Sequence, residues 1–205
     1  MSAFFDPRGL LATPLVYASL MNMLGADDGM AIFVRDHLRP RAGARVLDLG
    51  CGPGRLYPHL PTADYCGIDS DAAYLNRART LYPQGCFELG DVAAEGAGLG
   101  SGKYDLIVAC GLLHHLPDDA ASQMLFACRD RLRRGGRLVT LDCVFGADQN
   151  LFSRLLVAGD RGGFVRTGDG YLALARARFP DAALSIRHDL LRVPYSHAIL
   201  ECKQP

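Results

Sequence analysis

A short apolar run that ends in three alternating glycines constrains this chain more than any other stretch. Residues 46–54 read Val-Leu-Asp-Leu-Gly-Cys-Gly-Pro-Gly, and branched apolar residues in such a run are typical of a buried parallel strand. Glycines permit a tight turn at positive φ and let a ligand approach the backbone without meeting a Cβ. Asp48 is an acid inside this apolar strand. Because burying an unpaired polar group is costly, we expect Asp48 to have a partner.

A second acid follows at the spacing of a nucleoside site. Residues 64–69 are predicted to form the next strand and to place Asp69 at its carboxyl end. In a βαβ unit, an acid about twenty residues beyond the glycine turn reaches the ribose hydroxyls of a bound nucleoside. A dinucleotide site has the spacing Gly-x-Gly-x-x-Gly, but here the glycines alternate and Arg55 stands where the final small residue would fall.

These features resemble the class I, Rossmann-like S-adenosylmethionine-dependent methyltransferases of the small-molecule type. The first motif of that family is similar to residues 46–54 almost letter for letter, and further motifs follow in the family's order across residues 44–142. One departure is Arg134, which stands where the family usually has proline before two glycines. The matching segments are 67–71, 87–92, 104–116 and 133–139.

The resemblance implies S-adenosyl-L-methionine as cofactor, S-adenosyl-L-homocysteine as product, and no metal, since the sulfonium is already activated. It implies that the glycine turn faces the methionine part, that Asp69 accepts from both ribose hydroxyls, and that Asp91 accepts from the adenine amino group. The predicted cofactor-binding residues are Asp48, Gly50, Cys51, Gly52, Gly54, Asp69, Ser70, Asp91, Val92 and Cys110.

Two adjacent histidines after the fourth predicted strand are the candidate catalytic residues. Histidine titrates near neutral pH and can remove a proton from a hydroxyl or amine as the methyl group arrives. Neighbouring side chains in a strand-to-helix turn point in different directions, so at most one is expected to be the base. Between His115 and His114, the sequence reading favours His115.

The segment beyond residue 143 is predicted to form the substrate side. Two arginines in its glycine-rich turn suit an acceptor carboxylate or phosphate through forked hydrogen bonds. The alternative is a surface ion pair between Asp160 and one of these arginines. The predicted substrate-side residues are Arg161, Arg166, Tyr195 and His197.

Alternating strands and helices predict the fold class α/β, a doubly wound Rossmann-like sheet that is mostly parallel with an antiparallel last strand and helices on both faces. A length of 205 residues suits one domain. Residues 1–43 are predicted to be a helical segment that either forms a lid or packs on the sheet, 44–142 the cofactor-binding core, and 143–205 the substrate-side segment with the closing strands. Predicted helices cover 10–24, 28–38, 71–82, 118–133, 149–158 and 168–178, and the later predicted strands cover 86–90, 104–110, 137–142, 183–190 and 196–202.

The composition of the chain indicates which classes of binding partner are not expected. The formal net charge is zero, with 22 basic and 22 acidic residues, so neither nucleic acid nor an anionic membrane is an expected partner. Seven cysteines without a Cys-x-x-Cys pair predict free thiols of a reducing compartment rather than a disulfide framework. No His or Cys spacing suggests zinc, and no leader or membrane-spanning stretch is evident. A cytoplasmic protein is expected, and the oligomeric state stays open.

The predicted function is methyl transfer to a small-molecule acceptor by in-line displacement, with the acceptor atom (O, N, C or S) left open. Two alternatives share the fold: an enzyme that cyclises or cleaves the cofactor without methylating, and a non-catalytic cofactor-binding subunit. An RNA methyltransferase would need a basic face or an RNA-binding module, and the sequence shows neither.

Overall fold

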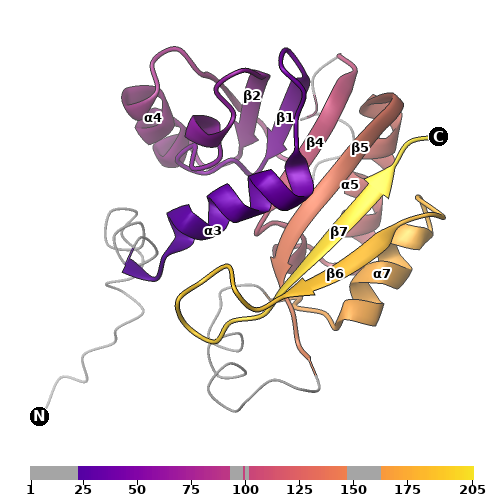
Figure 1. The fold of residues 1–205 in the computed structure, drawn as a ribbon. Coiled ribbons are helices and arrows are strands. Elements are labelled where there is room, and N and C mark those ends of the chain that lie inside the picture. The colour runs from indigo at the N-terminus through magenta and orange to yellow at the C-terminus, as the bar shows by residue number, and fades with distance from the viewer. Residues whose placement is uncertain (1–22, 93–98, 100–101, 147–162) are drawn as a thin grey trace, which may run out of the picture.

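One sheet organises the part of the chain that the computed structural model describes, which comprises residues 23–92, 99, 102–146 and 163–205. Its seven strands lie in the order β3-β2-β1-β4-β5-β7-β6 (Figure 1). The first five strands pair in parallel, and β7 is antiparallel to both β5 and β6. The predicted doubly wound fold is confirmed. The strands are β1 (Arg45–Leu49), β2 (Asp64–Asp69), β3 (Cys86–Leu89), β4 (Tyr104–Cys110), β5 (Leu132–Cys143), β6 (Ala183–Arg187) and β7 (His197–Lys203).

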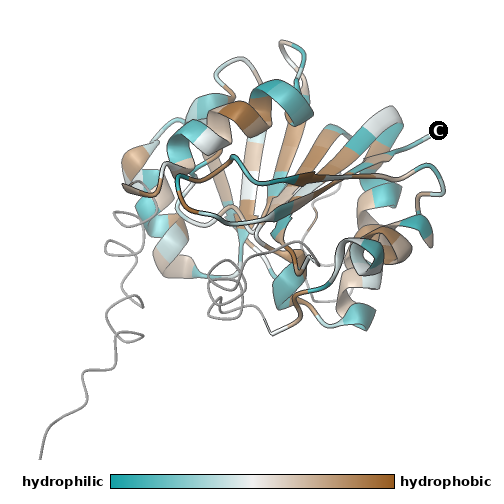
Figure 2. Ribbon diagram, turned by 60° about the horizontal axis from the view of Figure 1, so that its bottom comes forward, coloured by the Kyte–Doolittle hydropathy of each residue, from teal (hydrophilic) through white to brown (hydrophobic). Residues whose placement is uncertain are grey.

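Helices cover both faces of the sheet. On one face, α3 (Ala26–Phe33), its π-helical continuation η1 (Val34–Leu38) and α4 (Ala72–Leu81) enclose one core cluster; on the other, α5 (Asp118–Arg131) and α7 (Gly168–Arg176) enclose a second. Successive strand residues divide between the clusters, because a strand points alternate side chains to opposite faces. Val46 packs with α3 and α4, whereas Leu47 packs with α5 and α7. Figure 2 shows these apolar strands between the two helix layers.

Several predicted boundaries shift. Strand β5 begins at Leu132, five residues before the predicted start, because Gly135 at a φ of 74° lets the chain bulge and continue the pairing with β4. Pro117 is the N-cap of α5, and Asp118 is its first helical residue. The predicted helix 149–158 and nearly all of the predicted helix 10–24 lie outside the described residues.

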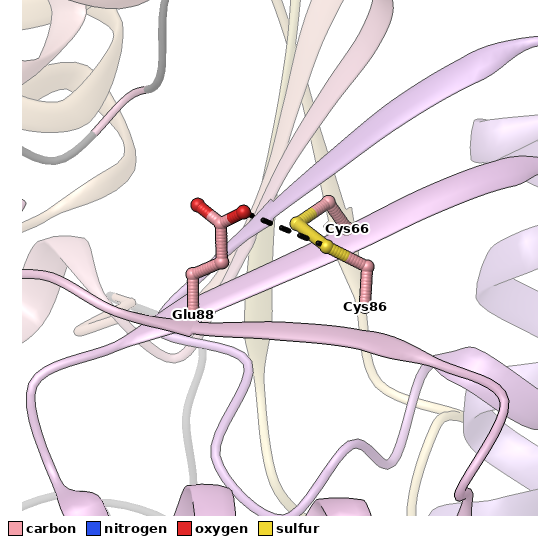
Figure 3. Close-up of side chains that lie close together, drawn as sticks. All are labelled: Cys66, Cys86 and Glu88. Atoms are coloured by element: carbon pink, nitrogen blue, oxygen red, sulfur yellow. Dashed lines mark hydrogen bonds between the residues drawn. A yellow bond between two sulfur atoms is a disulfide. The ribbon is translucent and has the colours of Figure 1, made fainter.

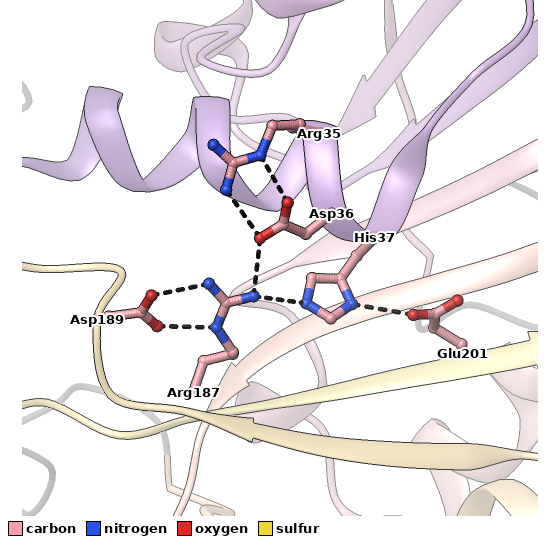
Figure 4. A network of polar contacts seen from close by, with 6 residues as sticks. All are labelled: Arg35, Asp36, His37, Arg187, Asp189 and Glu201. Carbon is pink, nitrogen blue, oxygen red and sulfur yellow. Dashed lines mark hydrogen bonds and ion pairs between the residues drawn. The ribbon is translucent and has the colours of Figure 1, made fainter.

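The helix formed by α3 and η1 packs on the sheet. Phe33 and Leu38 are fully buried. A polar network then fastens η1 to β6 and β7 (Figure 4): His37 Nδ1 lies 2.9 Å from Glu201, and Arg187 binds a carboxylate of η1 at 3.1 Å. In the part of the chain that the structure describes, no helix is both long and apolar enough to cross a membrane.

Candidate functional site

The glycine turn after β1 leaves backbone uncovered at the carboxyl edge of the sheet. Gly50, Gly52 and Gly54 have φ values of 67°, 53° and 80°, in a region that residues with a Cβ rarely adopt. A Cβ on Gly54 would lie 3.0 Å from the ring of Phe87, whereas a Cβ on Gly52 would meet nothing within 4 Å. Gly54 is therefore needed for packing, while the backbone at Gly52 faces open space.

Asp69, at the carboxyl end of β2, holds this turn in place. Its Oδ2 accepts a hydrogen bond from the Gly52 N–H at 2.8 Å, and its Oδ1 accepts one from the Asp71 N–H at 2.8 Å. The Gly50 N–H also donates to the carbonyl of Ile68 at 2.8 Å. Because a carboxylate has about four lone-pair positions, Asp69 keeps the capacity to accept from ribose hydroxyls while it anchors the turn.

Asp48 lies inside the sheet and is only 2% exposed. The hydroxyl of Tyr65 donates to Asp48 Oδ2 at 2.7 Å, so the expected partner exists. Burial is the main reason that the pKa of Asp48 rises to about 7; the Tyr65 hydrogen bond opposes this rise and the negative charge of Asp69 adds to it. Burial also raises the pKa of the Cys51 and Cys110 thiols, so both predicted cofactor-side cysteines are neutral at pH 7.

The remaining predicted cofactor residues lie at neighbouring strand ends. Ser70 follows β2, Asp91 and Val92 follow β3, and Cys110 ends β4. Ser70 and Asp91 are exposed, while Val92 packs against the core cluster of α5 and α7. Because β1 to β4 are parallel, the structure brings these residues and the glycine turn to one edge of the sheet, where doubly wound folds bind ligands.

The two histidines occupy the 3-10 turn η3 (Leu113–His115) after β4, and their surroundings differ. His114 is 5% exposed, and its Nδ1 lies 2.9 Å from Oδ1 of Asp142 on β5. The His114 backbone N–H donates to the same oxygen at 3.2 Å. His115 is exposed, with its ring centroid 4.2 Å from that of His114. His114 is thus paired with an acid, whereas the sequence favoured His115 as the base.

Asp142 is a site residue that the sequence reading missed. It is 1% exposed, and its Oδ2 has no hydrogen-bond partner among the described residues. The sequence signal was present: Asp142 is an acid in the apolar run 138–143, as Asp48 is in β1. A buried carboxylate with an unsatisfied oxygen is costly, and such groups collect at functional sites.

Arg166, predicted on the substrate side, has each guanidinium N–H engaged within the chain. Nε and Nη2 donate to Asp118 Oδ1 at 2.9 and 2.6 Å. Nη1 donates to the carbonyls of Leu113 and Phe164 at 2.8 and 3.0 Å, and Nη2 also donates to that of Leu116 at 2.8 Å. Since a guanidinium has only five donors, these contacts use all of them, and the prediction that Arg166 binds an acceptor carboxylate or phosphate gains no support from the structure. Its ion pair among the described residues is with Asp118; Asp160, the predicted partner, lies outside the described residues.

Tyr195 and His197 lie at the same edge as Asp142. Their ring centroids are 4.9 Å apart, and His197 pairs with Cys143, the residue after Asp142, in the β5–β7 register. The structure thus brings two of the predicted substrate-side residues close to the His114 partner. Arg161 lies outside the described residues.

One prediction about the cysteines is wrong. Cys66 and Cys86 form a disulfide between β2 and β3, with Glu88 beside it (Figure 3). The pairing follows from register, because the two residues lie directly opposite each other in the parallel ladder with Cα atoms 4.6 Å apart. The other five cysteines are free thiols.

Comparison with known proteins finds methyltransferases. A methyltransferase domain family matches residues 46–136. The trans-aconitate 2-methyltransferase of Variovorax paradoxus is 43% identical over 79 residues, which are 37% of this chain and 30% of that protein. The ubiquinone biosynthesis O-methyltransferase of Acinetobacter baylyi is 32% identical over 112 residues, which are 52% of this chain and 46% of that protein. The chain spans less than half the length of either curated relative.

Solved structures share the fold. A TehB-like S-adenosylmethionine-dependent methyltransferase of Corynebacterium glutamicum superposes with a TM-score of 0.64 at 22% identity, over 97% of this chain and 100% of that one. The magnesium protoporphyrin IX methyltransferase of Synechocystis, solved with bound S-adenosylhomocysteine, gives a TM-score of 0.65 at 21% identity, over 97% and 92% of the two chains.

The described residues fit the cofactor of this family. Gly52 offers backbone with room where a Cβ would stand, and Asp69 places a carboxylate beside it at the carboxyl end of β2. Both lie at the carboxyl edge of the parallel strands, where the fold binds nucleotides. Residues 46–136 therefore match a methyltransferase domain family, and the described fold is that of S-adenosylmethionine-dependent methyltransferases of known structure.

Proposed function

We propose that this chain methylates a hydroxyl group of a small-molecule acceptor, with His114 as the general base. The observation that carries the proposal is the buried pair of His114 Nδ1 and Asp142 Oδ1, at 2.9 Å. The turn that bears it adjoins the glycine turn, since a Cβ on Gly50 would lie 3.2 Å from the side chain of Leu112. A base at this position favours an acceptor that must lose a proton, as a hydroxyl does when it becomes a methyl ether.

The chain's residues have distinct roles in this proposal. When bound, S-adenosylmethionine supplies an electrophilic methyl group on a sulfonium sulfur. The glycine turn holds its methionine part, Asp69 its ribose hydroxyls and Asp91 its adenine amino group. These contacts orient the methyl group toward the acceptor, and holding two reactants in line supplies much of the rate enhancement of a displacement.

Proton transfer falls to His114. A carboxylate only accepts hydrogen bonds, so Asp142 takes one from Nδ1–H, and that tautomer carries its basic lone pair on Nε2. Nε2 would take the acceptor's hydroxyl proton as that oxygen receives the methyl group, which the bound cofactor would supply. The Asp142 carboxylate favours the charged imidazolium that results.

The domain organisation and the cellular location of the protein follow from the same proposed function. It treats residues 1–205 as one methyltransferase domain, with 143–205 on the acceptor side, because Asp142, Tyr195 and His197 share one sheet edge. It places the protein in the cytoplasm, which the five free thiols support and the Cys66–Cys86 disulfide opposes.

Methyl-labelled cofactor tests the proposal. The full chain is incubated with label and a panel of phenols, enols and, as the first-named curated relative suggests, tricarboxylates. Label is expected to move to a hydroxylated acceptor. His114→Ala is expected to lower kcat by about 10²–10⁴-fold, the usual contribution of a general base, with the affinity for S-adenosylhomocysteine unchanged; His115→Ala serves as the matched control and is expected to retain most activity.

The outcomes separate the rivals. Label that stays on the thionucleoside in the presence of every acceptor would support cyclisation or cleavage of the cofactor. A fully active His114→Ala variant would show that His114 is not the base. Transfer of label only to tricarboxylates would show that the acceptor group is a carboxylate, which needs no base, and not a hydroxyl.

A further inference from the structure

We infer that Arg166 is a positioning residue that sets the contact between His114 and Asp142; the inference rests on the proposed function, in which His114 is the base. Arg166 is not a ligand for the acceptor, because its donors are engaged within the chain. What distinguishes it is that its side chain and its backbone bind two different strand ends.

The side chain binds the turn after β4. Arg166 Nη1 and Nη2 bind the carbonyls of Leu113 and Leu116, which flank the two histidines, each at 2.8 Å. Phe164, two residues before Arg166, also binds His114 directly, because its backbone N–H donates to the His114 carbonyl at 2.9 Å. The turn is therefore held on both sides of the base and at the base itself.

The backbone binds the segment after β5. The Arg166 carbonyl accepts a hydrogen bond from the Phe145 N–H at 3.1 Å, and Thr167 forms a bridge with the same residue. Phe145 follows Asp142 by three residues. One residue thus connects the turn that carries the base to the strand end that carries its acid partner.

Burial shows which of these contacts matter. The Arg166 side chain is 11% exposed, whereas its ion-pair partner Asp118 is 81% exposed. An exposed ion pair contributes little to stability, so the hydrogen bonds to the carbonyl groups are what hold the histidine turn in position. Lysine keeps the charge but lacks the planar fork that reaches several carbonyls at once.

The test compares three variants of the full chain. Arg166→Lys is expected to lower kcat at least tenfold, because small displacements of a catalytic group cost large factors in rate, and to leave the Kd for S-adenosylhomocysteine within twofold. Asp118→Asn removes only the exposed ion pair and is expected to stay within twofold on both measurements. Arg178→Lys is the matched control: Arg178 lies over the Phe126 ring and donates to Ser122, and both of these residues belong to α5.

A second readout does not depend on turnover. The pKa of the His114 imidazole, followed by nitrogen-15 NMR and assigned with His114→Gln among the six histidines, is expected to fall in Arg166→Lys, because a looser contact with Asp142 stabilises the imidazolium less. Arg166→Gln is expected to show the same fall, so a lysine variant that does not fold leaves the test intact.

Two results would overturn the inference. One is an unchanged kcat and an unchanged His114 pKa in the folded Arg166 variants. The other is a parallel loss of kcat, cofactor affinity and thermal stability, which marks a general structural role. If His114→Ala is fully active, the proposed function fails, yet the NMR measurement still decides whether Arg166 positions this side chain.

Discussion

Asp48 and Asp142 are the two buried carboxylates among the described strand residues, and their partners give them different properties. Asp48 is bound by the Tyr65 hydroxyl, and burial raises its pKa to about 7. Asp142 is bound by His114 and has one oxygen without a partner among the described residues. A hydroxyl can form a hydrogen bond with a carboxyl group in its protonated or its ionised form. An imidazole that gains a proton instead favours the ionised carboxylate. We therefore expect Asp48 to act through stability and Asp142 through catalysis.

The raised pKa of Asp48 makes stability depend on pH in a defined direction. A carboxyl whose folded pKa lies above its unfolded value of 3.8 contributes stability that is complete below about pH 4 and is lost as the pH rises through about 7. Asp48→Asn has no such loss and keeps an acceptor for Tyr65. The free energy of unfolding of the variant relative to the parent is expected to rise by about 2–3 kcal/mol between pH 5 and pH 8.

Urea denaturation at the two pH values measures this difference. Asp64→Asn is the control, because Asp64 begins β2, the strand that ends at Asp69, and its side chain is 72% exposed. No comparable rise is expected for it. If the stability of Asp48→Asn relative to the parent is the same at both pH values, the pKa of the buried Asp48 carboxyl is not raised.

At the scale of elements, α3 is fitted tightly against the loop between β6 and β7. A Cβ on Gly29 would overlap the carbonyl oxygen of Leu190, whose side chain is buried in the same core cluster as Phe33. Arg192 closes the contact by donating from its backbone N–H to the Leu24 carbonyl at 2.8 Å. The N-terminal helix and the closing strands therefore form one packed unit.

This packing predicts an inverted glycine effect. In a helix, glycine to alanine normally stabilises by about 1 kcal/mol. Gly29→Ala is expected to destabilise the protein instead by about 1–3 kcal/mol, as overpacking does. Gly163→Ala is the matched control, since a Cβ there meets nothing within 4 Å and its φ is not in the left-handed region. A stabilised Gly29→Ala, measured by urea denaturation, would show that α3 does not contact the loop this closely.

The Cys66–Cys86 disulfide joins an edge strand, β3, to the strand that carries Asp69. Its partners are 20 residues apart in sequence, and closing a loop of this size stabilises by about 3 kcal/mol in the chain-entropy description. Reduction is expected to lower the free energy of unfolding of the parent and to leave that of Cys86→Ser unchanged. Alkylation after denaturation counts the thiols: five without reductant and seven with it are expected from the pairing in the structure. Seven without reductant would mean that the pair is not bonded.

At the scale of the whole molecule, the sequence predicted what is local and missed what depends on register. The apolar strand, the glycine turn and Asp69 lie within 24 residues of one another, from 46 to 69, and all were predicted. The His114–Asp142 pair spans 28 positions and the Arg166 contact with Leu113 spans 53. The disulfide required β2 and β3 to be aligned with Cys66 opposite Cys86. Residue type does not encode such alignments, because they follow from the packing of the complete sheet.

Binding at the sheet edge should stabilise the whole fold by mass action. A ligand that binds only the folded state at about 100 times its Kd adds about 2.7 kcal/mol, which for a chain of this size raises Tm by about 5–10 °C. S-adenosylhomocysteine is expected to produce this shift in thermal unfolding, and NADH is not, because the third glycine of a dinucleotide turn is replaced by Arg55. Asp69→Ala should lose most of the shift at the same concentration, since it removes the ribose acceptor and the hydrogen bond to Gly52. A rise in Tm with NADH alone would show that the glycine turn binds a dinucleotide. An undiminished rise in Tm for Asp69→Ala with S-adenosylhomocysteine would show that Asp69 does not bind the ribose.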